Sequence, residues 1–368
     1  MITVKLFRGE TEIRALAPAW RSLTAQLKLK RHFHHVEWYL ALAHTLEQHN
    51  LTQLQCVTVF SDTDKLVAVF PCRVERVQIG PIPLNAIRLA SDHIDAHTAR
   101  DITIAPDLAE TKFFQGFIRY MAEHDPIWDV IELAGIMEDS SAATALKHCP
   151  QLPIILTPGG VRGRIEFVSC SDGADPFARL SKGFKQNLRT AHHKLEPTQV
   201  TFEVARTPTD LARLLPEFLT VESSGWKGAL GTSALTHSAT NTFLGQLLHH
   251  FGPSGGCEIH VMRYADKPVA TLFGITPDHI WYIFRIGYDE THHRASPGHL
   301  IIENLLKQNA MDKLFNVLTP YNATPWFNAW KPDRILQISN AYVFRPTSQG
   351  MELADRVASI MRGLTQSG

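Results

Sequence analysis

Two segments of the chain, residues 54–73 and 256–275, share one hydrophobic pattern at a shift of 202 residues. Each alternates apolar and polar side chains on both sides of a polar turn, which is typical of a β-hairpin. The shift aligns them without a gap. The aligned positions are Val57, Val59, Asp64, Lys65, Val67 and Ala68 in the first segment and Ile259, Val261, Asp266, Lys267, Val269 and Ala270 in the second.

The elements around the two hairpins also follow one order. Two helical patterns precede each hairpin, and a helix and a short apolar strand follow it. The expected ranges are 10–27, 36–48, 108–123 and 128–133 in the first half and 208–222, 241–251, 297–311 and 314–319 in the second. The sequence therefore predicts two α/β units of similar plan. We expect domains over residues 1–165 and 166–350, with a helical tail over 351–368.

Composition limits the classes of function. Lys and Arg total 36, as do Asp and Glu, so the formal charge is zero and bulk attraction to DNA or membranes is disfavoured. No stretch approaches the 18 or so apolar residues of a membrane span. The five cysteines are scattered and form no CxxC pair. We therefore expect a reducing, cytoplasmic location and no metal site.

An anion site is predicted where a strand pattern turns into a helix, over residues 287–303. Pro297 suits the first helical position, where its missing N–H costs nothing. Gly298 lets a ligand approach the backbone. The free N–H groups and the dipole of a helix start attract phosphate. The first half has neither a glycine nor a basic residue before its corresponding helix, so only the second half should hold a phosphate-bearing cofactor.

The C-terminal half resembles the GNAT (Gcn5-related) acyltransferase superfamily. More narrowly, it resembles the cellulose-biosynthesis (CelD/BcsL-type) acetyltransferases, which are related to the Fem-like transferases with two tandem GNAT-type domains. Four segments, within roughly 175–335, carry the likeness: a basic helix at 184–195, an acidic then Trp-Lys stretch at 222–228, a Ser-Pro-Gly loop at 288–298 and an aromatic tail at 315–330. The chain departs from the pattern at Phe327 and Asn316, where the family tends to have Lys and Asp.

This resemblance implies two tandem GNAT-like domains, each a mixed, mostly antiparallel sheet flanked by helices. It also implies transfer of an acyl group, in the first instance acetyl, from acetyl-CoA or another acyl-CoA to the amine of a small molecule or an amino sugar. The residues expected to hold the cofactor are Arg294, Ala295, Ser296, Pro297, Gly298 and His299. The alternative is an ordinary helix start beside a surface arginine.

Acyl transfer to an amine needs a proton acceptor, a donor for the leaving thiolate and an acceptor pocket. Glu222 is our candidate to accept the amine proton or to order a water, and Tyr321 to protonate the thiolate. Trp226 and Lys227 are expected to line the acceptor pocket, and Arg285 to meet an acceptor carboxylate. The alternatives are a solvated helix end for Glu222, packing for Tyr321 and Trp226, solvent for Lys227 and an internal salt bridge for Arg285.

Two other functions stay open at this point. One is a Fem-like transferase that takes its acyl group from aminoacyl-tRNA. The zero net charge weighs modestly against it, because RNA-binding proteins normally carry an excess of basic residues. The other is a non-catalytic scaffold in a polysaccharide or secondary-metabolite pathway.

Overall fold

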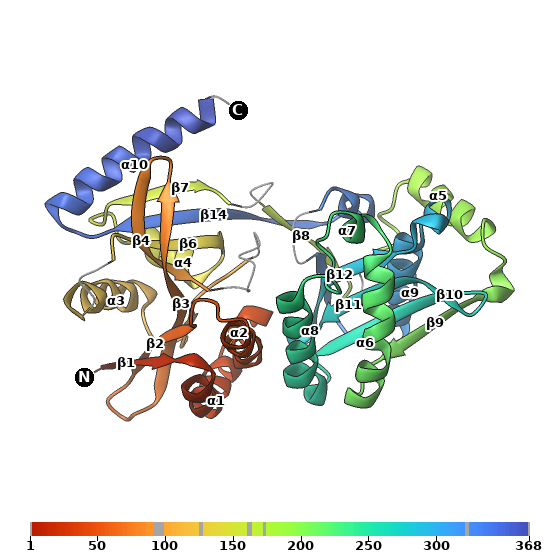
Figure 1. The fold of residues 1–368 in the computed structure, drawn as a ribbon, viewed down its shortest axis with the longest axis horizontal. Coiled ribbons are helices and arrows are strands. Elements are labelled where there is room, and N and C mark those ends of the chain that lie inside the picture. Colours follow the sequence, from red (N-terminus) through yellow and green to blue (C-terminus); the bar gives the residue numbers. More distant parts are fainter. Residues whose placement is uncertain are drawn as a thin grey trace. The chain divides into compact units, whose positions relative to one another are not determined.

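The chain divides into two compact units (Figure 1). Unit 1 comprises Met1–Arg164 together with Leu336–Gly368, and unit 2 comprises Ile165–Ile335. The structure, a computed structural model, describes residues 2–90, 99–124, 128–159, 164–171, 174–320 and 324–366.

Unit 1 is built on a sheet with the strand order β1-β2-β3-β4-β6-β14, in which β5 pairs with β3 and β7 with β14. Every pair is antiparallel except β4 with β6, which are parallel. The strands are β1 (Thr3–Arg8), β2 (Gln55–Phe60), β3 (Leu66–Ile79), β4 (Ile82–Leu89), β5 (Thr103–Ile104), β6 (Val130–Met137), β7 (Ile154–Pro158) and β14 (Arg334–Phe344). The helices are α1 (Gly9–Ala25), α2 (Val36–Gln48), α3 (Glu110–His124), α4 (Ser141–Lys147) and α10 (Ser348–Gln366).

Unit 2 has a sheet with the order β9-β10-β11-β12-β13-β8. Again the pairs are antiparallel except one, β12 with β13. The strands are β8 (Arg164–Ser169), β9 (Val200–Ala205), β10 (Cys257–Tyr264), β11 (Lys267–Ile275), β12 (Ile280–Tyr288) and β13 (Val317–Pro320). The α-helices are α5 (Lys182–His193), α6 (Pro208–Ser223), α7 (Trp226–Ala229), α8 (Ser238–Phe251) and α9 (Pro297–Asp312). Short 3₁₀ helices are η5 (Glu290–Ala295) and η6 (Pro325–Trp330).

The two units therefore repeat one plan, and the predicted fold class is confirmed. In both, four antiparallel strands are followed by a helix that crosses over to a parallel fifth strand: α3 joins β4 to β6, and α9 joins β12 to β13. Such a crossover is needed because parallel neighbours cannot be joined by a tight turn.

The two hairpins form as predicted, but their strand registers differ by one residue. Val57 lies opposite Phe70, whereas Ile259 lies opposite Phe273 rather than Leu272. The second hairpin turns through only Ala265 and Asp266, both with positive φ. This is a type I′ geometry, which suits a tight two-residue hairpin. If the first strands of the two hairpins are aligned at a shift of 202 residues, the structurally equivalent positions of the second strands differ by 203 residues.

The division into units differs from the expected domains at the C-terminal end. Residues 336–350 were expected in the second domain, but β14 runs into unit 1, where Ile338–Phe344 pair with β6 and β7. The expected tail forms α10, which packs on the same unit through Ala354 and Val357. Hydrophobic patterning identifies a strand but not the strands it pairs with, so the pairing of β14 with unit 1 could not be predicted from it.

Local signals fix the helix starts of unit 2. The side chains of Ser181 and Thr207 cap α5 and α6 by accepting bonds from backbone N–H groups, and Pro297 occupies the first turn of α9. The predicted start of α9 is thereby confirmed. In the described part of the chain, no helix is long and apolar enough to cross a membrane.

Helices α6 and α9 cover opposite faces of the unit 2 sheet (Figure 1). A Cβ on Gly287 of β12 would lie 2.5 Å from Cα of Glu222 in α6. On the other face, a Cβ on Gly298 of α9 would lie 3.5 Å from the ring of Tyr288, the next residue of β12. Because successive residues of a strand point to opposite faces, these contacts assign one helix to each side.

Replacing Gly274 of β11 by alanine should destabilise unit 2. The added Cβ would lie 2.1 Å from the indole of Trp281, which is 1% exposed and cannot move aside into solvent. Overpacking of this kind costs about 1–3 kcal/mol. Urea unfolding of G274A should show this loss in the free energy of unfolding.

The matched control is G245A in helix α8, where no atom lies within 4 Å of the added Cβ. Alanine is the better helix former, so this variant should be as stable as the parent or up to about 1 kcal/mol more stable. Equal stability of the two variants would contradict the packing described for Gly274.

Candidate active site

Strand β12 extends beyond the end of its pairing with β13. Within the described residues, the parallel pairing runs from Ile280 opposite Val317 to Ile283 opposite Pro320, while β12 continues to Tyr288 in contact with β11. Among the described residues, the last part of β12 therefore has a strand neighbour on one side only, which leaves an opening beside it.

A β-bulge lies at the start of the opening. Arg285 pairs with Phe273 and Ile283 with Gly274, so Phe284 has no opposite residue on β11. The bulge turns two consecutive side chains to one face. The Phe284 ring lies 6.3 Å from Phe243 of α8, and Arg285 hydrogen-bonds to α6.

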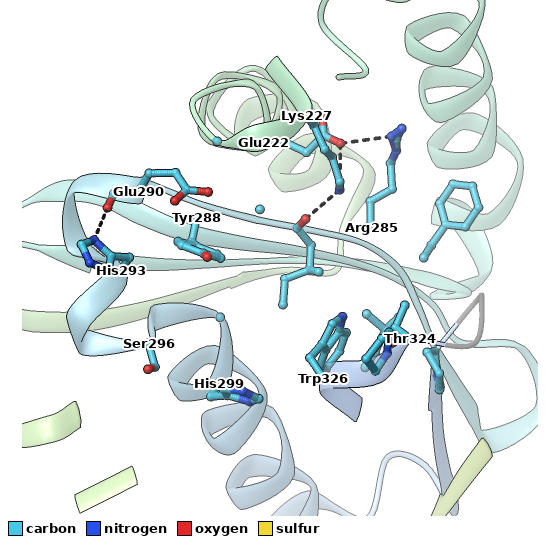
Figure 2. A pocket seen from close by; sticks show the side chains of 18 residues that line it. Glu222, Lys227, Arg285, Tyr288, Glu290, His293, Ser296, His299, Thr324 and Trp326 are labelled. Carbon is cyan, nitrogen blue, oxygen red and sulfur yellow. Dashed lines mark hydrogen bonds and ion pairs between the residues drawn. The ribbon is translucent and has the colours of Figure 1, made fainter. Parts of the chain in front are cut away.

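A pocket of about 660 Å³ occupies this opening, and all its lining residues belong to unit 2. Strand β12 forms one wall, the start of α9 and η5 forms the next, and the segment after β13 closes the third side (Figure 2). The lining residues are Glu222, Gly225, Lys227, Ile283, Phe284, Arg285, Ile286, Gly287, Tyr288, Glu290, His293, Ser296, Gly298, His299, Pro320, Thr324, Pro325 and Trp326.

Glu222 anchors a charged cluster in the wall of this pocket (Figure 2). Its Oε1 lies 3.1 Å from Lys227 Nζ and accepts a 3.1 Å hydrogen bond from the Arg285 guanidinium. Its Oε2 accepts a 2.8 Å bond from the Ala234 N–H. Lys227 Nζ also donates to the Ile286 carbonyl at 2.8 Å.

The two cations of the cluster are partly exposed, whereas the carboxylate is enclosed. The Glu222 side chain is 0% exposed, against 17% for Lys227 and 15% for Arg285. Burial lowers the pKa of Lys227, and the neighbouring Arg285 lowers it further, while Glu222 raises it in part. The ammonium is therefore held by its partners in a place where water stabilises it poorly.

The start of α9 forms the opposite side of the pocket. Ser296 adopts a left-handed conformation, with φ 47° and ψ 51°, immediately before Pro297. Ser296, Gly298 and His299 line the pocket, whereas Ala295 and Pro297 are buried beneath it.

Arg294 does not line this pocket. Its side chain is exposed, and its carbonyl accepts a 2.7 Å bond from Lys194 Nζ at the end of α5. This matches the surface-arginine alternative for its side chain more closely than direct contact with a pocket ligand.

His299 sits among aromatic rings. The Phe184 ring lies 5.1 Å away and the Trp326 ring 6.1 Å away. Burial lowers the pKa of His299, because imidazolium is poorly solvated there. Its Nδ1 is buried and has no hydrogen-bond partner among the described residues. A polar atom in this state is a ready partner for a ligand or water in the pocket.

Comparison with known proteins assigns unit 2. Residues 182–318, which include most of the pocket, match the family described as acetyltransferase (GNAT) domain. This match supports an acyltransferase with a GNAT-type fold in unit 2, called the GNAT domain below. No curated protein sequence matches the chain.

Solved structures extend the likeness to the fold of both units. FemX shares 9% identity and a TM-score of 0.59, covering 89% of this chain and 96% of its own. A protein of unknown function from Bacteroides thetaiotaomicron shares 11% identity and a TM-score of 0.57, covering 94% of this chain and 100% of its own. The C-terminal domain of a putative lysylphosphatidylglycerol synthetase from Agrobacterium fabrum shares 10% identity and a TM-score of 0.53, covering 95% and 96%. At such low identity these matches show the fold alone.

The pocket of the GNAT domain gathers Glu222, Lys227 and Arg285 at one wall and Ser296, Gly298 and His299 at another. Tyr321 lies outside the described residues. Trp226 begins α7, but its side chain lies outside the described part of the chain.

Several pocket residues were not singled out from the sequence. Trp326, Glu290 and His293 are the clearest. The signal for Trp326 was the aromatic stretch after β13, whose other member Phe327 is 0% exposed and packs in the core. A lysine would be costly at that buried position, which explains why the aromatic residue stands there.

Replacing Glu222 by glutamine should destabilise the GNAT domain strongly. The change leaves Lys227 and Arg285 side by side without their carboxylate, and breaking one partner out of a buried ion pair costs about 3–5 kcal/mol. Chemical unfolding of E222Q should show a loss of about 3 kcal/mol.

The matched control is E217Q in the same helix. Glu217 accepts a 3.1 Å bond from Arg263, but its side chain is 33% exposed, and exposed ion pairs contribute about 0–1 kcal/mol. Similar losses in both variants would contradict a central structural role for the Glu222 cluster.

Proposed function

We propose that the protein transfers an acyl group, most simply acetyl, from an acyl-CoA to the amine of a small molecule or an amino sugar. The observation that carries this proposal is the pocket beside the last part of β12, which is lined by a helix start on one side and by a charged cluster on the other. Ligand sites are typically concave, mostly apolar and furnished with a few polar groups, as this pocket is.

The start of α9 suits the phosphates of CoA. Its first turn contains no acidic residue, and the N–H groups and dipole at this end favour an anion. Gly298 leaves the backbone accessible, because even an added Cβ would meet only the Tyr288 ring at 3.5 Å and Ile286 at 3.6 Å. In the proposal, Ser296, Gly298 and His299 contact the cofactor, while Ala295 and Pro297 fix the turn. Arg294 contributes charge from the surface.

Acyl-CoA supplies an activated carbonyl carbon. In the reaction the ammonium first gives a proton to water. The amine nitrogen then bonds to that carbon, the carbon–sulfur bond breaks, the nitrogen loses a second proton, and the thiolate takes up one proton. We assign polarisation of the carbonyl to a backbone N–H of the bulged stretch of β12, since fixed backbone donors in a partly dry site stabilise developing oxyanions well. Tyr321 remains our candidate for protonating the thiolate.

Glu222 takes a positioning role in this proposal. Both its oxygens already accept hydrogen bonds or pair with cations, from Ala234, Lys227 and Arg285. It therefore holds Lys227 and Arg285 toward the acceptor and does not itself receive the proton. Trp226, which starts α7 in the same segment, is assigned to the acceptor side.

The narrower kinship with the cellulose-biosynthesis (CelD/BcsL-type) acetyltransferases is likewise a proposal. It is supported by the position of the Glu222–Gly228 stretch against the pocket, since this is one of the segments that carry the likeness. The cytoplasmic location is proposed on the buried state of all five cysteines.

Acetyl-CoA should raise the thermal midpoint of the protein, and G298L should abolish the shift. A ligand at about 100 times its dissociation constant adds roughly 2.7 kcal/mol to the folded state, which corresponds to several degrees. The leucine side chain would project into the pocket and block the start of α9. Thermal unfolding with acetyl-CoA, CoA and longer acyl-CoAs would also rank the acyl donors.

The control variant is G245L in α8, which should keep the full shift because a Cβ added there would meet no atom within 4 Å outside its own helix and Gly245 does not line the pocket. If no CoA thioester shifts the midpoint of the unsubstituted protein, the acyl-CoA proposal fails. An aminoacyl-tRNA donor or a scaffold function would then take its place.

A further inference from the structure

We propose that His299 and Thr324 bind the amide-bearing pantetheine arm of the acyl donor, and that this arm is enough for binding without the nucleotide of CoA. The inference rests on the proposed function and deepens it, because it names the part of the donor that the same pocket recognises. It predicts a wider class of donors, the acyl thioesters of pantetheine.

Two polar atoms in the pocket wall are buried and have no hydrogen-bond partner in the described part of the chain. They are Nδ1 of His299, in the first turn of α9, and Oγ1 of Thr324, at the residue before η6. A threonine before a helix commonly caps it, but the Thr324 side chain makes no such bond. Because buried polar groups are almost always paired, both atoms are ready partners for a ligand that enters the pocket.

The two atoms lie near one aromatic side chain, Trp326 (Figure 2). The ring of Trp326 is 6.1 Å from the ring of His299, and Thr324 precedes it by two residues. All three residues line the pocket. This part of the wall therefore combines an apolar surface with hydrogen-bonding groups, which suits a chain that alternates methylene and amide groups.

The hydrogen-bonding groups here are neutral. Burial lowers the pKa of His299, whose ring is 5.1 Å from that of Phe184. A neutral imidazole has one donor and one acceptor nitrogen, and the Thr324 hydroxyl can both donate and accept. An amide also offers a donor and an acceptor. A phosphate only accepts and is bound best by cations, so these side chains match the arm better than the phosphates.

The phosphates of CoA find little side-chain charge in the pocket. Among the described lining residues, η5 and the start of α9 contribute no lysine or arginine. Their lining residues are Glu290, His293, Ser296, Gly298 and His299. The Glu290 carboxylate opposes a polyanion, and the attraction of the helix start is weak near solvent. We therefore expect the nucleotide to add little to the binding of the arm.

Thr271 of β11 provides a matched comparison for Thr324. Its Oγ1 is likewise buried without a partner among the described residues, and the residue is 0% exposed. Thr271 does not line the pocket. The two threonines thus share the same unpaired state, and they differ in access to a ligand.

The test measures binding to the full-length protein by thermal unfolding and by calorimetric titration. The ligands are acetyl-CoA, S-acetyl-pantetheine, the nucleotide part of CoA, and S-acetyl-mercaptoethanol, a thioester without amide groups. We expect S-acetyl-pantetheine to raise the thermal midpoint and to bind within about tenfold of acetyl-CoA. The nucleotide and the mercaptoethanol thioester should bind far more weakly.

Variants assign the binding to the two side chains. T324V keeps the shape of the side chain and removes its hydroxyl, and H299F keeps an aromatic ring without nitrogen. Each should weaken binding of both acetyl-CoA and S-acetyl-pantetheine by about three- to tenfold, as expected for one lost hydrogen bond. T324S retains the hydroxyl and should bind both ligands like the parent, and T271V should leave their affinities unchanged.

The thermal midpoints of the unliganded variants provide a second readout. T324V and T271V should unfold at the same temperature as the parent or at a higher one, because each removes a buried hydroxyl that has no partner. Weaker binding by a T324V protein of undiminished stability cannot be attributed to unfolding.

Two results would overturn the inference. One is binding of acetyl-CoA without detectable binding of S-acetyl-pantetheine. The other is unchanged affinity for both ligands in T324V or in H299F. Absence of any thermal shift with either thioester would instead show that the proposed function itself is wrong, so the two failures are distinguishable in one preparation.

Discussion

Helix α6 approaches strand β12 so closely at Gly287 that even a methyl group would collide with the helix backbone. This contact sets the depth at which Glu222 enters the sheet face, and hence its reach to Arg285 on the same strand. The bulge at Phe284 is equally necessary, because it turns Arg285 toward α6 although its neighbour already faces that side. The charged cluster therefore depends on a close packing of backbone against backbone.

The site combines two kinds of surface that would be unstable alone. Aromatic rings surround His299 at the start of α9, and on the α6 side of the sheet the burial of Lys227 and Arg285 makes their charges costly. The enclosed carboxylate of Glu222, which pairs with both cations, offsets that cost. Buried charges of this kind lower the stability of the unliganded protein, and they favour ligands whose charges complement them.

Local chemistry was read well from the sequence. The first turn of α9 at Pro297, the bounds of α2 and the order of elements in each unit follow from capping residues and hydrophobic periodicity. The sequence predicts Glu222, Lys227 and Arg285 as site residues. Their mutual contact depends on a β-bulge that the hydrophobic pattern does not predict. The outward direction of Arg294 and the pairing of β14 are likewise tertiary effects, decided by which surfaces meet.

The return of β14 makes unit 2 an insertion within unit 1. On the ribosome, the residues of the GNAT domain are complete before the strand that pairs with β6 and β7 has been made. Until Ile338–Phe344 has been synthesised, the sheet of unit 1 lacks its last strand. All the residues of unit 2 are available for folding before that point. Unit 1 is thus begun first during synthesis but can be completed only after unit 2. In a stalled or truncated chain that lacks β14, the unpaired edge of β6 would be exposed and prone to aggregation.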